Sequence, residues 1–166
     1  MLETIVKGID AFSRKQGELT SMLIIPLLLV VIYEVFMRYV FNAPTTWGFE
    51  MTGFLYGLHY MFGLSYTDVN DGHVRVDIFT NRLPQKTQHV IGIVTLLVLF
   101  MPVMTPMVIW SAKYAITSVA GLERNPTSWG PPIWPLKCLM ALAFFFLWLQ
   151  GFSNLLKNIR GLRGQQ

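Results

Sequence analysis

Four long apolar stretches, arranged as two closely spaced pairs, constrain this sequence more than any other feature. A helix that crosses a bilayer needs about 20 consecutive, mostly apolar residues. The stretches that meet this requirement cover residues 19–41, 47–66, 90–112 and 133–156. Inside a bilayer the backbone has to satisfy its own hydrogen bonds, so helices are the expected form. The pattern predicts an all-α integral membrane protein whose four transmembrane helices form two hairpins.

The composition agrees with a membrane location and argues against an ordinary soluble domain. Hydrophobic residues make up 53% of the 166 residues and charged residues only 13%, whereas soluble domains carry about 25% charged residues. A soluble bundle would also need polar outer faces on its helices, which these stretches lack. We therefore expect residues 1–166 to form a single membrane domain that contacts the lipid bilayer. The net charge of +4 is spread over short segments, so we expect no nucleic-acid partner.

Residues 1–18 precede the first apolar stretch and have a two-sided pattern. Apolar residues recur at a spacing of three or four, and polar or charged residues fill the other side. The apolar series is Leu2, Ile5, Val6, Ile9 and Phe12. This pattern is typical of an amphipathic helix that lies in the membrane interface with its apolar face down. The alternative is a simple extension of the first spanning helix.

The most polar part of the chain, residues 67–89, separates the two predicted hairpins. We expect Asp71 to cap a short interfacial helix over about residues 73–82, in which Val74 and Ile78 face the bilayer. Asp68, Asp71 and Asp77 resemble the start of a calcium loop, but the closing glutamate is absent. A docking surface for another membrane protein is the alternative to a merely solvated helix here.

The distribution of basic residues predicts the orientation of the chain. Under the four-span arrangement, nine Lys or Arg residues fall in residues 1–18, residues 67–89 and the C-terminal tail, and four fall on the opposite side. Short loops rich in Lys and Arg remain in the cytoplasm. We therefore expect both termini and the 67–89 loop to be cytoplasmic, in a bacterial inner membrane.

Several polar residues lie within or beside the predicted spans. Glu34 and Arg38 are four residues apart and can pair on one helix face, which favours a structural role over a proton-coupling site. Glu50 lies in the first helical turn, where it either complements the helix dipole or contacts a partner subunit. The Gly53-x-x-x-Gly57 spacing predicts close helix packing. We expect His59 to be a hydrogen-bonded buried side chain rather than a haem or metal ligand.

Prolines and loops supply the remaining local signals. Pro26 predicts a bend in the first span, and the pair Pro102 and Pro106 predicts a bent or locally unwound third span. Residues 42–48 (NAPTTWG) and 125–130 (NPTSWG) are similar and each leads into the second helix of a hairpin. This similarity suggests a loose duplication of a two-helix unit.

No catalytic set emerges from the sequence, and we expect no enzymatic activity, cofactor or metal site. The three histidines are predicted at different depths, and no glycine-rich phosphate loop, Cys/His metal spacing or nucleophile motif is present in the sequence. The single cysteine, Cys138, falls inside the fourth apolar stretch, where a small buried residue is the ordinary explanation.

The order of several motifs resembles a known family. Arg38-Tyr-Val-Phe-Asn-Ala-Pro is followed by Trp47-x-x-Glu50, a glycine-bearing span and His73-Val-Arg-Val-Asp77. This series is similar to the small membrane subunit (DctQ-like) of tripartite ATP-independent periplasmic (TRAP) transporters. The segment Ser128-Trp-Gly-Pro-Pro-Ile-Trp-Pro135 resembles the branch associated with mannitol, chloroaromatic or other organic-acid substrates.

The resemblance implies an accessory role in transport. In the family, a periplasmic substrate-binding protein delivers an organic acid to a large multi-span subunit, which holds the substrate and sodium sites and moves by an elevator-like mechanism. The small subunit supports the large one. The positions that match the family are expected to serve subunit contact or orientation: Glu34, Arg38, Trp47, Glu50, His73 and Asp77. Trp47, Arg124 and Trp129 are expected to dock the binding protein.

One departure and two alternatives remain open. Phe49 stands where many relatives carry an acid, so a second acidic contact beside Glu50 is in doubt. A self-sufficient small exporter, working as a dimer through Glu34, is one alternative function. The haem- or quinone-binding membrane anchor of a redox enzyme is the other.

Overall fold

A computed structural model describes residues 2–73 and 83–164 of the chain. Within these residues the secondary structure is helical apart from one isolated β-bridge, between Arg124 and Pro132. The prediction of an all-α protein is confirmed. The helices are α1 (Leu2–Ser21), α2 (Ile24–Tyr39), α3 (Gly48–Val69), α4 (Gln85–Thr95), the π-helical turn η2 (Leu96–Phe100), α5 (Met101–Ala120) and α6 (Trp134–Arg163).

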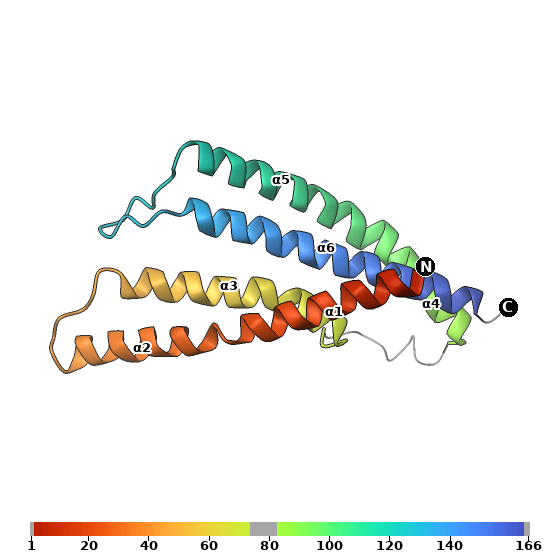
Figure 1. Ribbon diagram of the computed structural model, residues 1–166, viewed down its shortest axis with the longest axis horizontal. Coiled ribbons are helices and arrows are strands. Elements are labelled where there is room, and N and C mark those ends of the chain that lie inside the picture. Colours follow the sequence, from red (N-terminus) through yellow and green to blue (C-terminus); the bar gives the residue numbers. More distant parts are fainter. Residues whose placement is uncertain (1, 74–82, 165–166) are drawn as a thin grey trace.

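The helices form two elongated hairpins that lie side by side (Figure 1). The first consists of α1 and α2 followed by α3, and the second of α4, η2 and α5 followed by α6. Both chain ends lie at one end of the molecule, and the loops 40–47 and 121–133 lie at the other. We call these the terminal end and the loop end. This arrangement is compatible with the predicted topology, in which both termini share one side of the membrane.

Three helical stretches in the described part of the chain are long and apolar enough to cross a membrane: Glu3–Tyr39, Gln85–Ala120 and Trp134–Arg163. They account for three of the four predicted spans. The fourth, over residues 47–66, is the helix α3, which is long enough but contains Glu50, His59 and several glycines and tyrosines. A four-span arrangement therefore stays a prediction.

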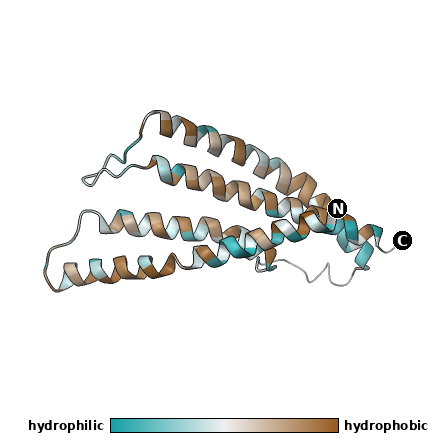
Figure 2. Cartoon of the chain, in the orientation of Figure 1, coloured by the Kyte–Doolittle hydropathy of each residue, from teal (hydrophilic) through white to brown (hydrophobic). Residues whose placement is uncertain are grey.

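The surface and interior are distributed as expected for a protein surrounded by lipid. Large apolar side chains of α2 and α5 point outward, and Figure 2 shows these helices as predominantly hydrophobic. The largest fully buried side chains are instead polar: Ser13, Ser65, Gln150 and Ser153. Small and polar residues are typical of helix contacts in membranes, because lipid already solvates apolar groups.

Two helix irregularities follow from proline. Pro26 has no N–H to donate to the carbonyl of Met22, and that carbonyl accepts from Ile25 instead, at 3.1 Å. The helix breaks there, between α1 and α2. In the second hairpin, the π-turn Leu96–Phe100 ends two residues before Pro102. Helix irregularities therefore occur beside Pro26 and Pro102, in the two spans where the sequence predicted them.

The N-terminal helix is not simply a surface element. Its residues 13, 17 and 20 are buried, and α1 packs against α3 and α6. Asp10 and Ser13, expected on the polar outer side, instead contact α6. Since α1 is also followed closely by α2 in one long helical run, Glu3–Tyr39 (Figure 1), the geometry favours the alternative of an extended first helix. An interfacial position for α1 stays a prediction.

The Gly53–Gly57 prediction is wrong within this chain. A Cβ atom added at Gly53, Gly57 or Gly63 would have no neighbour within 4 Å among the residues that the structure describes. The close approaches occur at other glycines. A Cβ at Gly17 would collide with the Tyr66 ring, and one at Gly151 with the Phe100 ring. Glycine spacing on α3 was thus misleading because α1 and α6 pack on a different face of that helix.

Candidate functional site

At the loop end, Glu34 connects α2 to the loop before α3. Glu34 is buried, and its Oε1 lies 2.8 Å from Nη2 of Arg38, one turn later. The hydroxyl of Thr45 donates to Oε2 of Glu34, and the Thr45 backbone N–H donates to the same oxygen at 3.3 Å. The predicted Glu34–Arg38 pair is therefore present. Its immediate effect is to hold the end of α2 against the turn.

The two similar loops have the same local hydrogen bond. Thr45 Oγ1 accepts from the N–H of Gly48 at 3.1 Å, and Thr127 Oγ1 accepts from the N–H of Gly130 at 3.3 Å. In both loops a threonine thus binds the amide three residues later. This shared geometry supports the suggested duplication of a two-helix unit.

Contacts between the second loop and the start of α3 join the two hairpins at the loop end. Asn125 Nδ2 donates to Glu50 Oε2 at 2.9 Å, which joins the second loop to the first turn of α3. The Trp129 ring lies 6.4 Å, centroid to centroid, from the ring of Phe54. The carboxylate of Glu50 therefore has an intramolecular partner, in addition to its place in the first turn of α3.

A charged cluster follows at the start of α6. Lys137 is buried and binds Glu123, and its Nζ lies 3.9 Å from the ring centroid of Tyr114. The hydrogen bond from Lys137 holds the pKa of the Glu123 carboxyl below its ordinary value of 4.5. These contacts connect α5, the second loop and α6. Arg124, next to this cluster, is exposed and donates to the carbonyl of Gly130 at 3.4 Å.

The structure divides the predicted subunit-contact residues among several places. Glu34 and Arg38 are paired on α2. The Trp47 ring stacks on the Tyr33 ring, with 5.8 Å between the ring centroids. Glu50 belongs to the contact between the second loop and the first turn of α3. The docking candidates Trp47, Arg124 and Trp129 all lie at the loop end. His73 follows α3 at the opposite end, and Asp77 lies outside the described residues, as does most of the predicted helix 73–82.

A polar cluster at the terminal end was missed by the sequence analysis. Gln150, which is 0% exposed, accepts from Ser13 Oγ at 2.7 Å and donates to Asp10 Oδ1 at 3.0 Å. Ser153 donates to the same Asp10 oxygen at 2.9 Å, and Lys157 binds the other oxygen at 2.8 Å. This Asp10–Gln150 cluster fastens α1 to α6.

Further hydrogen bonds extend from this cluster to α3. Ser65 donates to Gln16 on α1 at 2.9 Å, and Asn154 on α6 donates to Asp68 at 2.7 Å. His59 Nδ1 lies 3.2 Å from the backbone oxygen of Thr20. This contact fits a hydrogen-bonded side chain between helices, the interpretation favoured from the sequence.

The pattern that predicts the cluster is present in the sequence. Polar residues in the last helix recur at 150, 153, 154, 157 and 158, which is one face of a helix. In α1, residues 10, 13, 16 and 20 form a matching polar series. We placed Asp10 and Ser13 on the polar side of an interfacial helix, although polar faces in membrane helices also pair with one another.

The described residues offer no arrangement suited to metal chemistry. No group of three or more His, Cys, Asp or Glu side chains lies close enough together there to hold an ion. Cys138 is free and partly buried. The charged and polar side chains described above instead bind one another, and these contacts hold the helices and loops together.

Comparison with known proteins settles the relationship. Residues 27–161 match the family model described as "Tripartite ATP-independent periplasmic transporters, DctQ component". The chain belongs to the DctQ family. The match extends from α2 into the end of α6, so it includes α2 and α3 of the first hairpin and the whole second hairpin up to residue 161, but not α1. A search of curated proteins finds no significant match.

Membership of the DctQ family confirms the resemblance drawn from the motifs of residues 38–77. The protein is a transporter component with membrane-spanning helices. The family also gives the two hairpins a context, since a DctQ component is one part of a tripartite assembly.

Proposed function

We propose that this chain is the accessory small membrane subunit of a sodium-coupled importer of an organic acid. A periplasmic binding protein would deliver the acid, and a large multi-span subunit would move it. The DctQ chain would pack against the large subunit in the bacterial inner membrane, with its loop end in the periplasm. The observation that carries this proposal is the family match over residues 27–161.

The internal use of charged groups supports an accessory role over independent transport. A coupled transporter needs ionisable groups that can release and bind protons or ions during its cycle. Glu34, the acid required by the small-exporter alternative, is bound to Arg38 and Thr45. Asp10 is bound to Lys157, Gln150 and Ser153. These carboxylates serve contacts between structural elements, which suits a static scaffold.

The proposed orientation rests on the basic residues. The terminal end carries Lys157, Arg160 and Arg163 in the last turns of α6, where excess positive charge favours the cytoplasm. The loop end then faces the periplasm and presents Trp47, Arg124 and Trp129. Docking of the binding protein on these residues is part of the proposal.

The decisive experiment is reconstitution. The tagged chain is first purified from native membranes in mild detergent, and a stoichiometric large partner is identified by mass spectrometry. Proteoliposomes then contain this chain alone, the large subunit alone, or both, and uptake of a labelled organic acid is measured with the binding protein and an inward sodium gradient. We expect sodium-dependent uptake only when both membrane subunits are present.

Three outcomes would contradict the proposal. Uptake or efflux by this chain alone that disappears in Glu34→Gln would establish the small-exporter alternative. Equal uptake with and without this chain would remove its role as a required subunit. A haem Soret band or stoichiometric bound quinone in the purified chain would instead indicate a redox anchor.

A further inference from the structure

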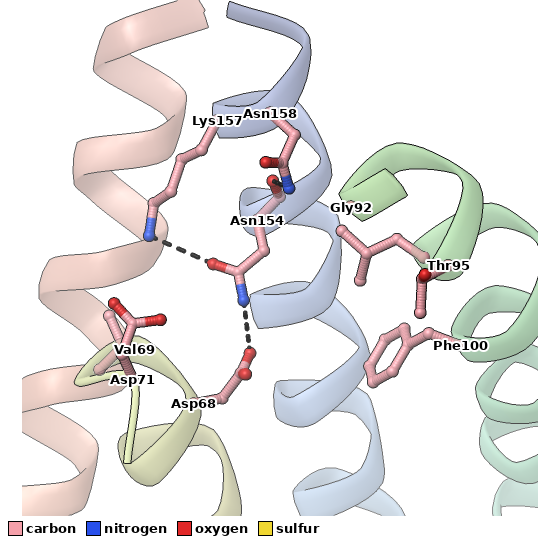
Figure 3. A pocket seen from close by; sticks show the side chains of 10 residues that line it. Asp68, Val69, Asp71, Gly92, Thr95, Phe100, Asn154, Lys157 and Asn158 are labelled. Carbon is pink, nitrogen blue, oxygen red and sulfur yellow. Dashed lines mark hydrogen bonds between the residues drawn. The ribbon is translucent and has the colours of Figure 1, made fainter. Parts of the chain in front are cut away.

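The helix α3 has a face that the other described helices leave uncovered. Figure 1 shows the helices in the order α2, α3, α6 and α5, and α3 contacts α1, α2 and α6. One hydrogen bond of the contact with α6, from Asn154 to Asp68 at 2.7 Å, is drawn in Figure 3. These three neighbours leave part of the circumference of α3 open.

The open face is a straight stripe along the helix. The exposed residues between positions 48 and 60 are Phe49, Gly53, Tyr56 and Tyr60, which recur at spacings of four, three and four. Residues at this spacing lie on one side of a helix and form the seam along which a second helix packs. We call these four residues the α3 seam.

The two tyrosines of the seam lie near the middle of the predicted span. The 22 residues of α3 give a length of about 33 Å, close to the thickness of about 30 Å of the hydrocarbon core. The midpoint of α3 falls between Leu58 and His59, so Tyr56 and Tyr60 are within about 4 Å of it along the helix axis. Tyrosines that contact lipid are typical of the membrane interface instead, where the hydroxyl meets water.

The hydroxyls of Tyr56 and Tyr60 favour protein over lipid as the neighbour of this face. The two side chains are 59% and 61% exposed, and neither hydroxyl forms a hydrogen bond with the residues that the structure describes. Acyl chains offer no acceptor, so a hydroxyl that faces them loses the hydrogen bonds it makes with water. A neighbouring helix can supply acceptors, because polar side chains form hydrogen bonds across helices in membranes.

The family favours a different protein over a second copy of this chain as the source of that helix. A DctQ component is one part of a tripartite assembly, and the family match over residues 27–161 includes all of α3. The outward side chains of α2 and α5 are mainly large and apolar, which suits lipid. Among these three helices, α3 therefore offers the face whose chemistry calls for a protein partner.

We propose that a transmembrane helix of the large subunit packs along the α3 seam. This inference rests on the proposed function and on the predicted four-span arrangement. The partner helix presents hydrogen-bond acceptors to Tyr56 and Tyr60 at the middle of the bilayer. It comes closest at Gly53, where an added Cβ atom would have no neighbour within 4 Å among the described residues. Phe49 contacts the same helix nearer the loop end.

Photo-crosslinking of the full-length chain tests the proposal. The photoreactive amino acid p-benzoylphenylalanine replaces Tyr60, the chain is co-expressed with the large subunit, and membranes are irradiated. We expect an adduct with a transmembrane segment of the large subunit, identified by mass spectrometry. The same probe at Val103 of α5, which is 59% exposed and near the middle of Gln85–Ala120, is the control and should give no adduct with that subunit.

Removing only the hydroxyls separates partner binding from the stability of the chain. Tyr56→Phe combined with Tyr60→Phe keeps both rings, and we expect about tenfold weaker association with the purified large subunit, equivalent to about 1.4 kcal/mol. The Tm of the isolated double variant in detergent should stay near the wild-type value. Tyr39→Phe, at an exposed tyrosine near the loop end of α2, is the matched control and should keep wild-type association.

A steric variant addresses the seam without removing a hydrogen bond. Gly53→Leu fills the space in which the partner helix lies, so we expect it to prevent recovery of the complex while the isolated chain stays folded. Gly8→Leu makes the same change on α1, at a glycine that is also open toward the described residues. This control should assemble normally.

Two results would overturn the α3 seam and leave the proposed function intact. One is a complex that forms and transports while the probe at residue 60 labels only lipid or a second copy of this chain. The other is wild-type association in both the double tyrosine variant and Gly53→Leu. If the wild-type chain recovers no large subunit, the proposed function fails and this inference fails with it.

Discussion

The side-chain amide of Asn125 donates a hydrogen bond to the carboxylate of Glu50 at 2.9 Å, across 75 positions of sequence. This contact links the second loop directly to the first turn of α3. Both residues are partly buried, so the hydrogen bond is protected from water on one side. It holds the second loop, which has little regular structure, against the second helix of the first hairpin.

We predict that Asn125→Ala lowers the stability of the chain by about 1.5 kcal/mol, the lower end of the range for a hydrogen bond to a charged group. The loss should appear as a lower Tm in mild detergent. Thr46→Ala, an exposed change in the first loop, is the control and should leave the Tm near the wild-type value. If Glu50→Ala and Asn125→Ala have strictly additive effects, the two side chains are not coupled as described.

The Asp10–Gln150 cluster predicts a larger effect. Gln150→Leu leaves the buried hydroxyl of Ser13 without its acceptor and removes one of the hydrogen bonds to Asp10, and an unsatisfied buried polar group costs about 1–3 kcal/mol. We therefore expect a clear loss of thermal stability and easier proteolysis within α1. Gln88→Leu, at a more exposed site on α4, provides the matched control. Equal behaviour of the two leucine variants would show that the cluster does not fasten α1 to α6.

The glycine contacts predict opposite effects for the same substitution. Gly151→Ala places a Cβ against the Phe100 ring, and we expect a loss of about 1–3 kcal/mol from overpacking. Gly53→Ala enters open space and should stabilise the isolated chain by up to about 1 kcal/mol, because alanine favours helix. Thermal unfolding of the two variants in the same detergent measures both effects. Destabilisation of the isolated chain by Gly53→Ala would contradict the open surface.

The Glu34–Arg38 pair gives a prediction about assembly. Arg38→Ala removes one partner of Glu34, and an incompletely compensated acid is worse than no acid at all. We expect Arg38→Ala to reduce recovery of the complex with the large subunit more than Glu34→Ala combined with Arg38→Ala. Co-purification in mild detergent, with expression matched between variants, measures the recovery. An equal or greater loss in the double variant would be inconsistent with this argument.

The Glu123–Lys137 contact predicts a dependence on acidity. Because the pKa of the Glu123 carboxyl is lowered in the folded protein, its contribution to stability is complete above the ordinary value of 4.5. This contribution to stability is lost as the pH falls below 4.5 and through the lower pKa that Glu123 has in the folded protein. We expect the Tm difference between wild type and Glu123→Gln to shrink between pH 7 and strongly acidic pH. A difference that stays constant would show that Glu123 is not ionised preferentially in the folded state.

The sequence predicted the class of the fold and the family. Long apolar stretches determine where a chain can enter a bilayer, and this information is local, because each stretch must hold about 20 apolar residues by itself. The irregular helices at Pro26 and Pro102 were also predictable, since a proline removes a specific backbone donor. The Glu34–Arg38 pair followed from a spacing of four residues on one helix.

The tertiary structure decided which faces meet, and this information is not local. Asp10 and Ser13 form a polar side of α1 in either environment, and only the position of α6 shows that they contact Gln150 rather than water. Gly53 and Gly57 have the spacing of a packing motif, but the close contacts are at Gly17 and Gly151. A spacing defines a helix face, whereas the neighbour of that face depends on how both hairpins pack together.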